Sequence, residues 1–147
     1  MKKGATGKGV GVSERFVYEY ERAGRGGAEP LRVALGFPSS YAAGMSNLGF
    51  LWVYHILNSG GGVLCDRFFF PDRADEFKGK VRSFESGQPI ASYDVVAFSL
   101  PYEADYPKMA WLLKRGGIEV FSADRDGLPL VLAGGVAVSS NPEPVAD

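Results

Sequence analysis

The stretch GFPSSYAAGMSNLG, residues 36–49, decides how the chain can fold. A short apolar run of strand length, residues 31–37, leads into it, and a longer apolar run of helix length, residues 50–57, follows it. Ser46 is a good N-cap, so we expect the helix to cover residues 47–58. A strand, a loop of small residues and a helix start together make a place to hold a ligand, because the first N–H groups of a helix have no partner inside it. The other interpretation is a tight turn that holds no ligand.

Known nucleotide-binding and catalytic motifs do not fit the chain. Gly44 to Gly49 matches the spacing of the first half of a phosphate-binding loop, but Phe50 stands where that motif needs lysine. The dinucleotide pattern GxGxxG is absent from the loop, and no GxSxG elbow is present for a hydrolase. A small-ligand module that binds phosphate or a nucleotide without these motifs remains the alternative function.

The composition is that of one ordinary globular domain. Of 147 residues, 46% are hydrophobic and 22% are charged. The formal net charge of −1 gives no electrostatic reason to expect nucleic-acid binding. The single cysteine, Cys65, excludes an internal disulfide and any multi-cysteine zinc or iron–sulfur site within this chain. Because there is no signal peptide and no apolar run near the ~20 residues of a membrane span, we expect a cytoplasmic protein without membrane contact.

The chain is expected to form a disordered tail, residues 1–14, and one α/β domain, residues 15–147. Alternating aromatic side chains at the start of that domain predict an extended segment that lays its rings on a surface; they are Phe16, Tyr18 and Tyr20. Strands are predicted over residues 31–37, 63–70, 94–100 and 129–133. Helices are predicted over residues 47–58 and 105–116, and a short one could form over residues 72–82.

Strands that alternate with helices imply right-handed βαβ units and a parallel sheet. We expect the order second, first, third, fourth strand. The carboxyl ends of the strands then gather at one edge, where three loops meet: residues 38–45, 101–104 and 134–144. In open parallel sheets ligands bind at that edge, and all three loops are rich in small or special residues. This agreement favours a binding site over a bare turn.

The helix over residues 47–58 is apolar nearly all round. One face at helical spacing, which we expect to pack on the sheet, consists of Leu48, Leu51, Trp52 and Ile56. Most of the opposite side is apolar as well, through Phe50, Val53, Tyr54 and Leu57. A helix of this kind is buried on all sides. Either the aromatic segment near the N-terminus covers it, or it docks against another domain or subunit.

Three stretches, in this order and spacing, resemble the N-terminal region of radical S-adenosylmethionine (radical SAM) proteins. They are PSSYAAGMSNLGF from residue 38, SFESGQPIASYDVVAFSLPYEADYP from residue 83 and LVLAGGVAVSSNPEPVAD from residue 130. That region of the family is similar to a cobalamin-binding domain. The resemblance runs from about residue 15 to residue 147. It implies a flavodoxin-like (Rossmann-like) α/β fold, an open parallel sheet with helices on both faces, layered against a following radical SAM barrel.

The resemblance also implies a cofactor site. It puts Ser99 and the pair Gly134 and Gly135 where cobalamin domains contact the nucleotide tail and the corrin ring. Together with the loop before the first helix, the candidate cofactor-binding residues are Tyr41, Gly44, Met45, Ser46, Ser99, Glu103, Gly134, Gly135 and Asn141. Cobalamin is the candidate cofactor, and no catalytic or metal-binding residue is predicted in this chain.

The sequence departs from the family pattern at two points. Cobalamin domains with a histidine axial ligand carry DxHxxG after the first strand, whereas residues 38–44 contain neither Asp nor His, and His55 lies far down the helix. A domain that keeps the shape without the cofactor therefore stays open. The CxxxCxxC motif that holds a [4Fe–4S] cluster is also missing. We expect an N-terminal accessory domain, cut short at its C-terminus, that performs no radical chemistry itself. The cluster, S-adenosylmethionine and the barrel would belong to a downstream domain.

Overall fold

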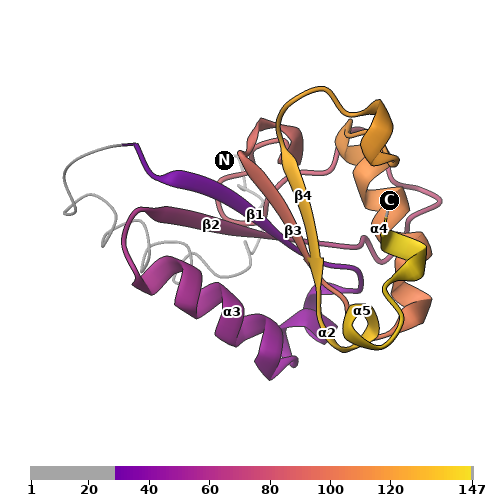
Figure 1. Cartoon of the computed structure of the whole chain (residues 1–147), viewed down its shortest axis with the longest axis horizontal. Coiled ribbons are helices and arrows are strands. Elements are labelled where there is room, and N and C mark those ends of the chain that lie inside the picture. The colour runs from indigo at the N-terminus through magenta and orange to yellow at the C-terminus, as the bar shows by residue number, and fades with distance from the viewer. Residues whose placement is uncertain (1–28, 147) are drawn as a thin grey trace, which may run out of the picture.

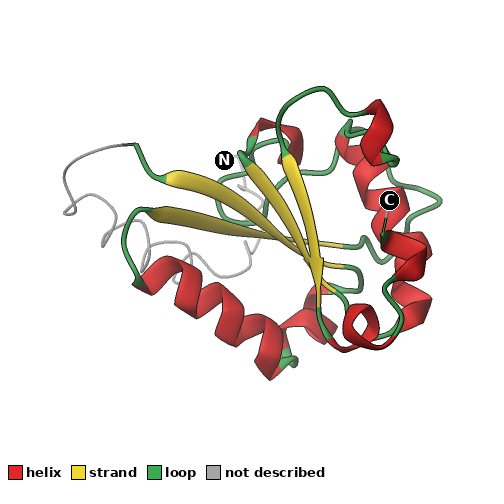
Figure 2. Ribbon diagram, in the orientation of Figure 1, coloured by secondary structure: helices red, strands yellow, loops and turns green. Residues whose placement is uncertain are grey.

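The computed structural model describes residues 29–146 (Figure 1). The predicted tail, residues 1–14, and the aromatic alternation of Phe16, Tyr18 and Tyr20 lie outside the described residues. Within the described part, an open sheet carries helices on both faces, as Figure 2 shows. The predicted fold class, a flavodoxin-like α/β fold, is confirmed.

All strands of the sheet are parallel, and their order is β2-β1-β3-β4, as predicted. Their bounds, which differ from the prediction only at strand ends, are β1 (Leu31–Phe37), β2 (Val63–Phe69), β3 (Val95–Ser99) and β4 (Leu130–Gly134). β1 is buried from Val33 to Phe37. An unbroken buried run is typical of a strand inside a parallel sheet, which has both faces covered.

Helices α3 (Leu48–Ser59) and α4 (Tyr106–Gly116) lie on opposite faces of the sheet (Figure 1). Successive side chains of β1 alternate between the two faces, so each face receives its own core. The core under α3 consists of Val33, Leu35, Phe37, Phe50, Tyr54 and Cys65. The larger core on the α4 side includes Ala34, Phe68, Val96, Phe98, Leu112 and Leu113. Cys65 is thus a packed, buried thiol, as expected.

The predicted N-cap of the first long helix is wrong. Asn47 caps α3, because its Oδ1 accepts the N–H of Phe50 at 2.9 Å. Ser46 instead ends an additional short helix, α2 (Tyr41–Met45), which Ser40 caps. This helix has only 5 residues, mostly small, so it leaves no apolar period in the sequence.

The face of α3 that packs on the sheet is also the opposite of the predicted one. The ring centroid of Phe50 lies 5.1 Å from that of Phe37 and 5.7 Å from that of Phe69. The side expected to face inward is open to solvent, with exposures of 78% at Leu48 and 60% at Trp52. Because both sides of the helix are apolar, periodicity could not choose between them. Aromatic packing against β1 and β2 makes the choice.

The connection from β2 to β3 contains no α-helix. Residues 72–82, where a short helix could form, are turns and irregular chain, and a 3₁₀ helix, η1 (Ile90–Ser92), precedes β3. Residues 83–85 lie along the outer edge of β2 instead. There the N–H of Phe84 donates to the carbonyl of Arg67 at 2.6 Å, and the carboxylate of Glu85 accepts the N–H of Arg67 at 2.6 Å.

Asn58, at the end of α3, closes the same outer edge of β2 further along. Its Oδ1 accepts the N–H of Cys65 at 3.1 Å, and its Nδ2 donates to the carbonyl of Cys65 at 3.2 Å. The outer edge of β2 is therefore occupied by a side-chain amide at one residue and by a loop at the next outward-facing one.

The remaining elements are short. They are η2 (Glu103–Asp105), η3 (Ser122–Asp124), α5 (Val136–Ser140) and η4 (Glu143–Val145). Pro107 stands in the first turn of α4, and Gly117, at a φ of 82°, closes that helix as expected. Among residues 29–146, we find no helix with the length and apolar character needed to cross a membrane.

Candidate functional site

The carboxyl ends of β1, β3 and β4 lie at one edge of the sheet, because the strands are parallel and in register. Two hollows open at this edge, one on either side of the first turn of α3. One lies on the face of the sheet beside α3, and we call it the apolar groove. The other lies between the loops that follow β1 and β3, and we call it the switch-point pocket, since the strand order reverses between these strands.

The apolar groove exists because α3 covers β1 and β2 and leaves the same face of β4 open. The consequence is visible at Leu130 and Leu132, whose exposures are 54% and 48%. The groove has a volume of about 380 Å³. Its walls are formed by Leu35, Gly49, Val53, Ala97, Phe98, Ser99, Leu132, Ala133, Gly134 and Gly135. Apart from the backbone, the Ser99 hydroxyl is the one polar group among them.

The two glycines of the groove have different reasons to be glycine. A Cβ at Gly134 would meet no heavy atom within 4 Å, so its hydrogen faces open space in the groove. Gly135 has a φ of 117°, and a Cβ there would lie 2.5 Å from the carbonyl oxygen of Leu100. The fold itself therefore requires Gly135, whereas Gly134 keeps the groove open.

The switch-point pocket is of similar size, about 380 Å³, and more polar. It is lined by Phe37, Ser39, Ala43, Ser46, Asn47, Tyr102, Ala104, Asp105 and Lys108. An ion pair stands in its wall, with Lys108 Nζ 2.9 Å from Asp105 Oδ1. Asp105 stands at the N-cap position of α4, but its side chain makes no cap hydrogen bond to that helix. The pocket forms because two loops that are distant in the sequence meet, whereas the ion pair is local, between residues three positions apart.

The predicted site residues are distributed over separate places. Ser46 lines the switch-point pocket, while Ser99, Gly134 and Gly135 line the apolar groove. Neither pocket includes Glu103, which is exposed in η2, or Asn141, whose carbonyl accepts the hydroxyl of Tyr106 at 2.7 Å.

The other predicted residues, Tyr41, Gly44 and Met45, pack toward β2. Tyr41 stacks on Phe84 with ring centroids 4.8 Å apart. A Cβ at Gly44 would come within 2.6 Å of the Phe69 ring, so close packing explains this glycine. Met45 Sδ accepts a hydrogen bond from Arg67 Nη1 at 2.9 Å. These residues line neither pocket.

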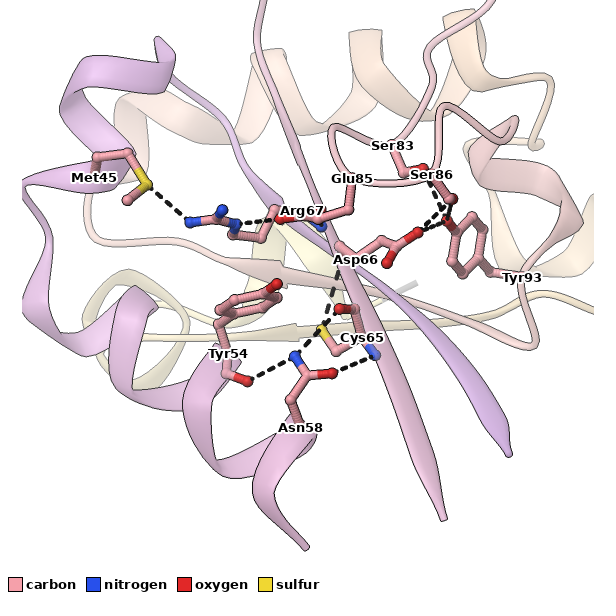
Figure 3. A network of polar contacts seen from close by, with 10 residues as sticks. All are labelled: Met45, Tyr54, Asn58, Cys65, Asp66, Arg67, Ser83, Glu85, Ser86 and Tyr93. Atoms are coloured by element: carbon pink, nitrogen blue, oxygen red, sulfur yellow. Dashed lines mark hydrogen bonds and ion pairs between the residues drawn. The ribbon is translucent and has the colours of Figure 1, made fainter. Parts of the chain in front are cut away.

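A buried polar network next to them was not anticipated from the sequence (Figure 3). Arg67 Nε lies 2.6 Å from Glu85 Oε1, and both side chains are at least nine-tenths buried. The Arg67 guanidinium also lies over the Tyr54 ring, 4.5 Å from its centroid. The neighbouring Asp66, which is fully buried, accepts the Tyr93 hydroxyl at 2.5 Å.

This network holds the loop of residues 83–93 against β2. Ser86 donates to Asp66 as well, and the Ser83 hydroxyl lies 2.8 Å from the Tyr93 hydroxyl, within hydrogen-bond distance. Burial, followed by the hydrogen bond to Asp66, raises the pKa of Tyr93. Each buried charged side chain here has a protein partner, Arg67 with Glu85 and Asp66 with Tyr93, so the network is a support for the fold. The only sequence signal for it was a pair of charges, Asp66 and Arg67, inside an apolar strand.

The two hollows at this edge of the sheet differ in the groups that line them. Over the range 29–146, no three His, Cys, Asp or Glu side chains gather where they could hold a metal ion. The groove provides an open apolar slot with one hydroxyl, and the switch-point pocket provides a charge pair with neighbouring amide and hydroxyl groups.

Comparison with known proteins identifies the family to which the chain belongs. A family model described as "Radical SAM proteins, N-terminal" matches residues 49–147, more than half of the chain. Neither a curated protein nor a solved structure matches the sequence. The matched residues include most of the walls of the apolar groove and all of α4. The chain therefore belongs to the family of N-terminal regions of radical SAM proteins.

Proposed function

We propose that this domain is the accessory, cofactor-binding domain of a radical SAM enzyme, and that its apolar groove holds the flat nucleotide end of a cobalamin-type cofactor. One observation carries the proposal. At Gly134 the sheet face is open, because a Cβ would find no heavy atom within 4 Å, although the residue lies in a strand. A planar aromatic group can lie against the sheet there, between α3 and β4.

The lining residues fit the nucleotide end of the cofactor but not its metal. Leu35, Val53 and Leu132 offer apolar walls, and Ser99 offers a hydroxyl at the carboxyl end of β3. The groove lining contains no imidazole, thiol or carboxylate that could bind cobalt. The chain's own residues would bind the cofactor, orient it and exclude water from its tail. The bound cofactor would supply cobalt chemistry to the parent enzyme.

The iron–sulfur cluster and S-adenosylmethionine belong, in this proposal, to a downstream barrel domain. The chain contains one cysteine, whereas a cluster of the radical SAM type needs three. The exposed apolar side of α3, with Leu48, Trp52 and Ile56, is the surface we assign to contact with that barrel. Apolar surface of this kind on a soluble domain marks an interaction site.

Titration of the purified chain with hydroxocobalamin, followed by its absorbance spectrum and by equilibrium dialysis, tests the groove. We expect saturable binding in the micromolar range and weakening of about tenfold or more in Gly134→Val, whose side chain would fill the slot. Circular dichroism should stay unchanged, because a Cβ at residue 134 would lie in open space, with no heavy atom within 4 Å. The matched control is Gly60→Val, at the far end of α3, where a Cβ would make only ordinary contact, 3.9 Å from Ile56 O.

Two further ligands sharpen the result. Cobinamide lacks the nucleotide end of the cofactor. Its affinity for the unaltered chain should therefore be no higher than the affinity of hydroxocobalamin for the Gly134→Val variant. Adenosine monophosphate probes the alternative function, a nucleotide-binding module. If adenosine monophosphate binds to the chain and hydroxocobalamin does not bind at all, the cobalamin proposal is wrong and the alternative replaces it.

A further inference from the structure

The switch-point pocket has no role in the function proposed above. It lies on the other side of the first turn of α3 from the groove, at the carboxyl ends of β1 and β3. Open parallel sheets bind ligands at the position where the strand order reverses. The side chains that line this pocket determine which polar groups a ligand must carry to bind there.

Asp105 supplies a buried acceptor. The residue is only 4% exposed, and its Oδ1 is held by Lys108 at 2.9 Å. Its Oδ2 receives no hydrogen bond from any residue in the described range. Buried carboxylate oxygens in proteins are nearly always hydrogen-bonded, because an unsatisfied one is costly. Since Asp105 lines the pocket, a ligand with an N–H or O–H donor would satisfy this oxygen.

Donors lie beside this acceptor. Lys108 has three N–H groups and uses one on Asp105, while its side chain is 38% exposed and lines the pocket. Asn47 uses its Oδ1 to cap α3 at Phe50 N, which leaves its Nδ2 with no hydrogen bond within the structure described. The Ser39 hydroxyl also lines the pocket. A ligand with an acceptor next to its donor can therefore be bound from both sides.

Charge narrows the class of ligand further. Asp105 and Lys108 cancel, so the pocket has no net formal charge. A carboxylate would face the carboxylate of Asp105, and an amine would face the ammonium of Lys108. A primary carboxamide is uncharged, and its NH₂ and C=O lie side by side in one plane. We propose that the switch-point pocket binds a small molecule through a primary carboxamide group, which donates to Asp105 Oδ2 and accepts from Lys108 or Asn47.

Nuclear magnetic resonance of the ¹⁵N-labelled chain, titrated with three matched small molecules, tests this proposal. Propionamide, propionate and propylamine have the same carbon skeleton and differ in the polar group. We expect propionamide to shift the amide signals of Ser46, Asn47, Asp105 and Lys108 with millimolar affinity. The other two should shift them far less. Equal shifts with all three, or none with propionamide, would overturn the proposal.

Substitutions in the pocket give an independent answer. Asp105→Asn should weaken propionamide about tenfold and strengthen propionate, because the lysine charge is then uncompensated. Lys108→Met should weaken propionamide, whereas Lys114→Met, an exposed lysine on the same helix, should not. Dispersed spectra check that each variant is folded. Unchanged propionamide affinity in folded Asp105→Asn would refute the role of this carboxylate. Gly134→Val should bind propionamide normally, so failure of the groove proposal leaves this result intact.

Discussion

Replacing Glu85 with alanine should destabilise the domain strongly. Its carboxylate accepts the backbone N–H of Arg67 at 2.6 Å through Oε2, and the Nε–H of Arg67 at 2.6 Å through Oε1. The Arg67 and Glu85 side chains are 4% and 6% exposed. The substitution would leave the guanidinium buried against Tyr54 without its carboxylate. Removing one partner of a buried ion pair costs about 3–5 kcal/mol, which approaches the whole stability of many domains.

Urea denaturation followed by circular dichroism measures this cost. With a denaturant slope of about 1–3 kcal/mol per molar urea, the midpoint should fall by about 1 M or more. The matched control is Glu76→Ala, which breaks an exposed pair with Arg73 whose side chains are 75% and 62% exposed. Such a pair contributes about 1 kcal/mol or less.

A comparison of the two variants decides the matter. If Glu85→Ala lowers the midpoint no further than Glu76→Ala, the buried pair does not hold the loop to β2, and the reasoning is refuted. A double variant, Arg67→Met with Glu85→Leu, should recover part of the loss, because it removes both buried charges together.

Four further predictions concern single side chains. Because the pKa of Tyr93 is raised above 10.0, the folded chain holds that proton more tightly than the unfolded chain, so stability is lost as the pH rises beyond about 10. Tyr93→Phe should reduce this loss in urea titrations at alkaline pH. Phe50→Ala should cost about 3–5 kcal/mol by the same assay, since the ring is fully buried. Gly135→Ala should lower the melting temperature and Gly134→Ala should not, because only the former strains the backbone. Trp52→Lys should lower the apparent mass in light scattering if the exposed side of α3 associates with itself.

The sheet could be predicted from the sequence because its signals are local and redundant. Each strand is an apolar run that ends at proline, glycine or a polar turn, and β1 is apolar at nearly every position. The alternation of strands and long connections then gives the parallel order through the handedness of crossovers. Two residues of the groove, Ser99 and Gly134, were predicted from the resemblance to the family, and Gly134 also begins one of the loops expected at the strand ends.

Other features depend on contacts between distant residues, which no local pattern reports. The inner face of α3 was predicted wrongly because Trp52 and Phe50 are equally apolar, and only Phe37 and Phe69 select the latter. The partner of Arg67 is 18 residues away in a polar loop. Tyr41, Gly44 and Met45 were grouped with the ligand loop, although α2 turns them toward β2. A ligand role for these three residues stays a prediction for which the geometry gives no support.

Because the outer edge of β2 is occupied, another strand cannot pair with the sheet on that side. Asn58 at Cys65, and Glu85 with Phe84 at Arg67, use the backbone groups through which another strand could pair. At the opposite edge, β4 has no strand beside its outer side among residues 29–146. A strand from another segment or another molecule can therefore extend this sheet only next to β4. Any such extension would be built beside the groove, so assembly at that edge and occupancy of the groove would influence each other.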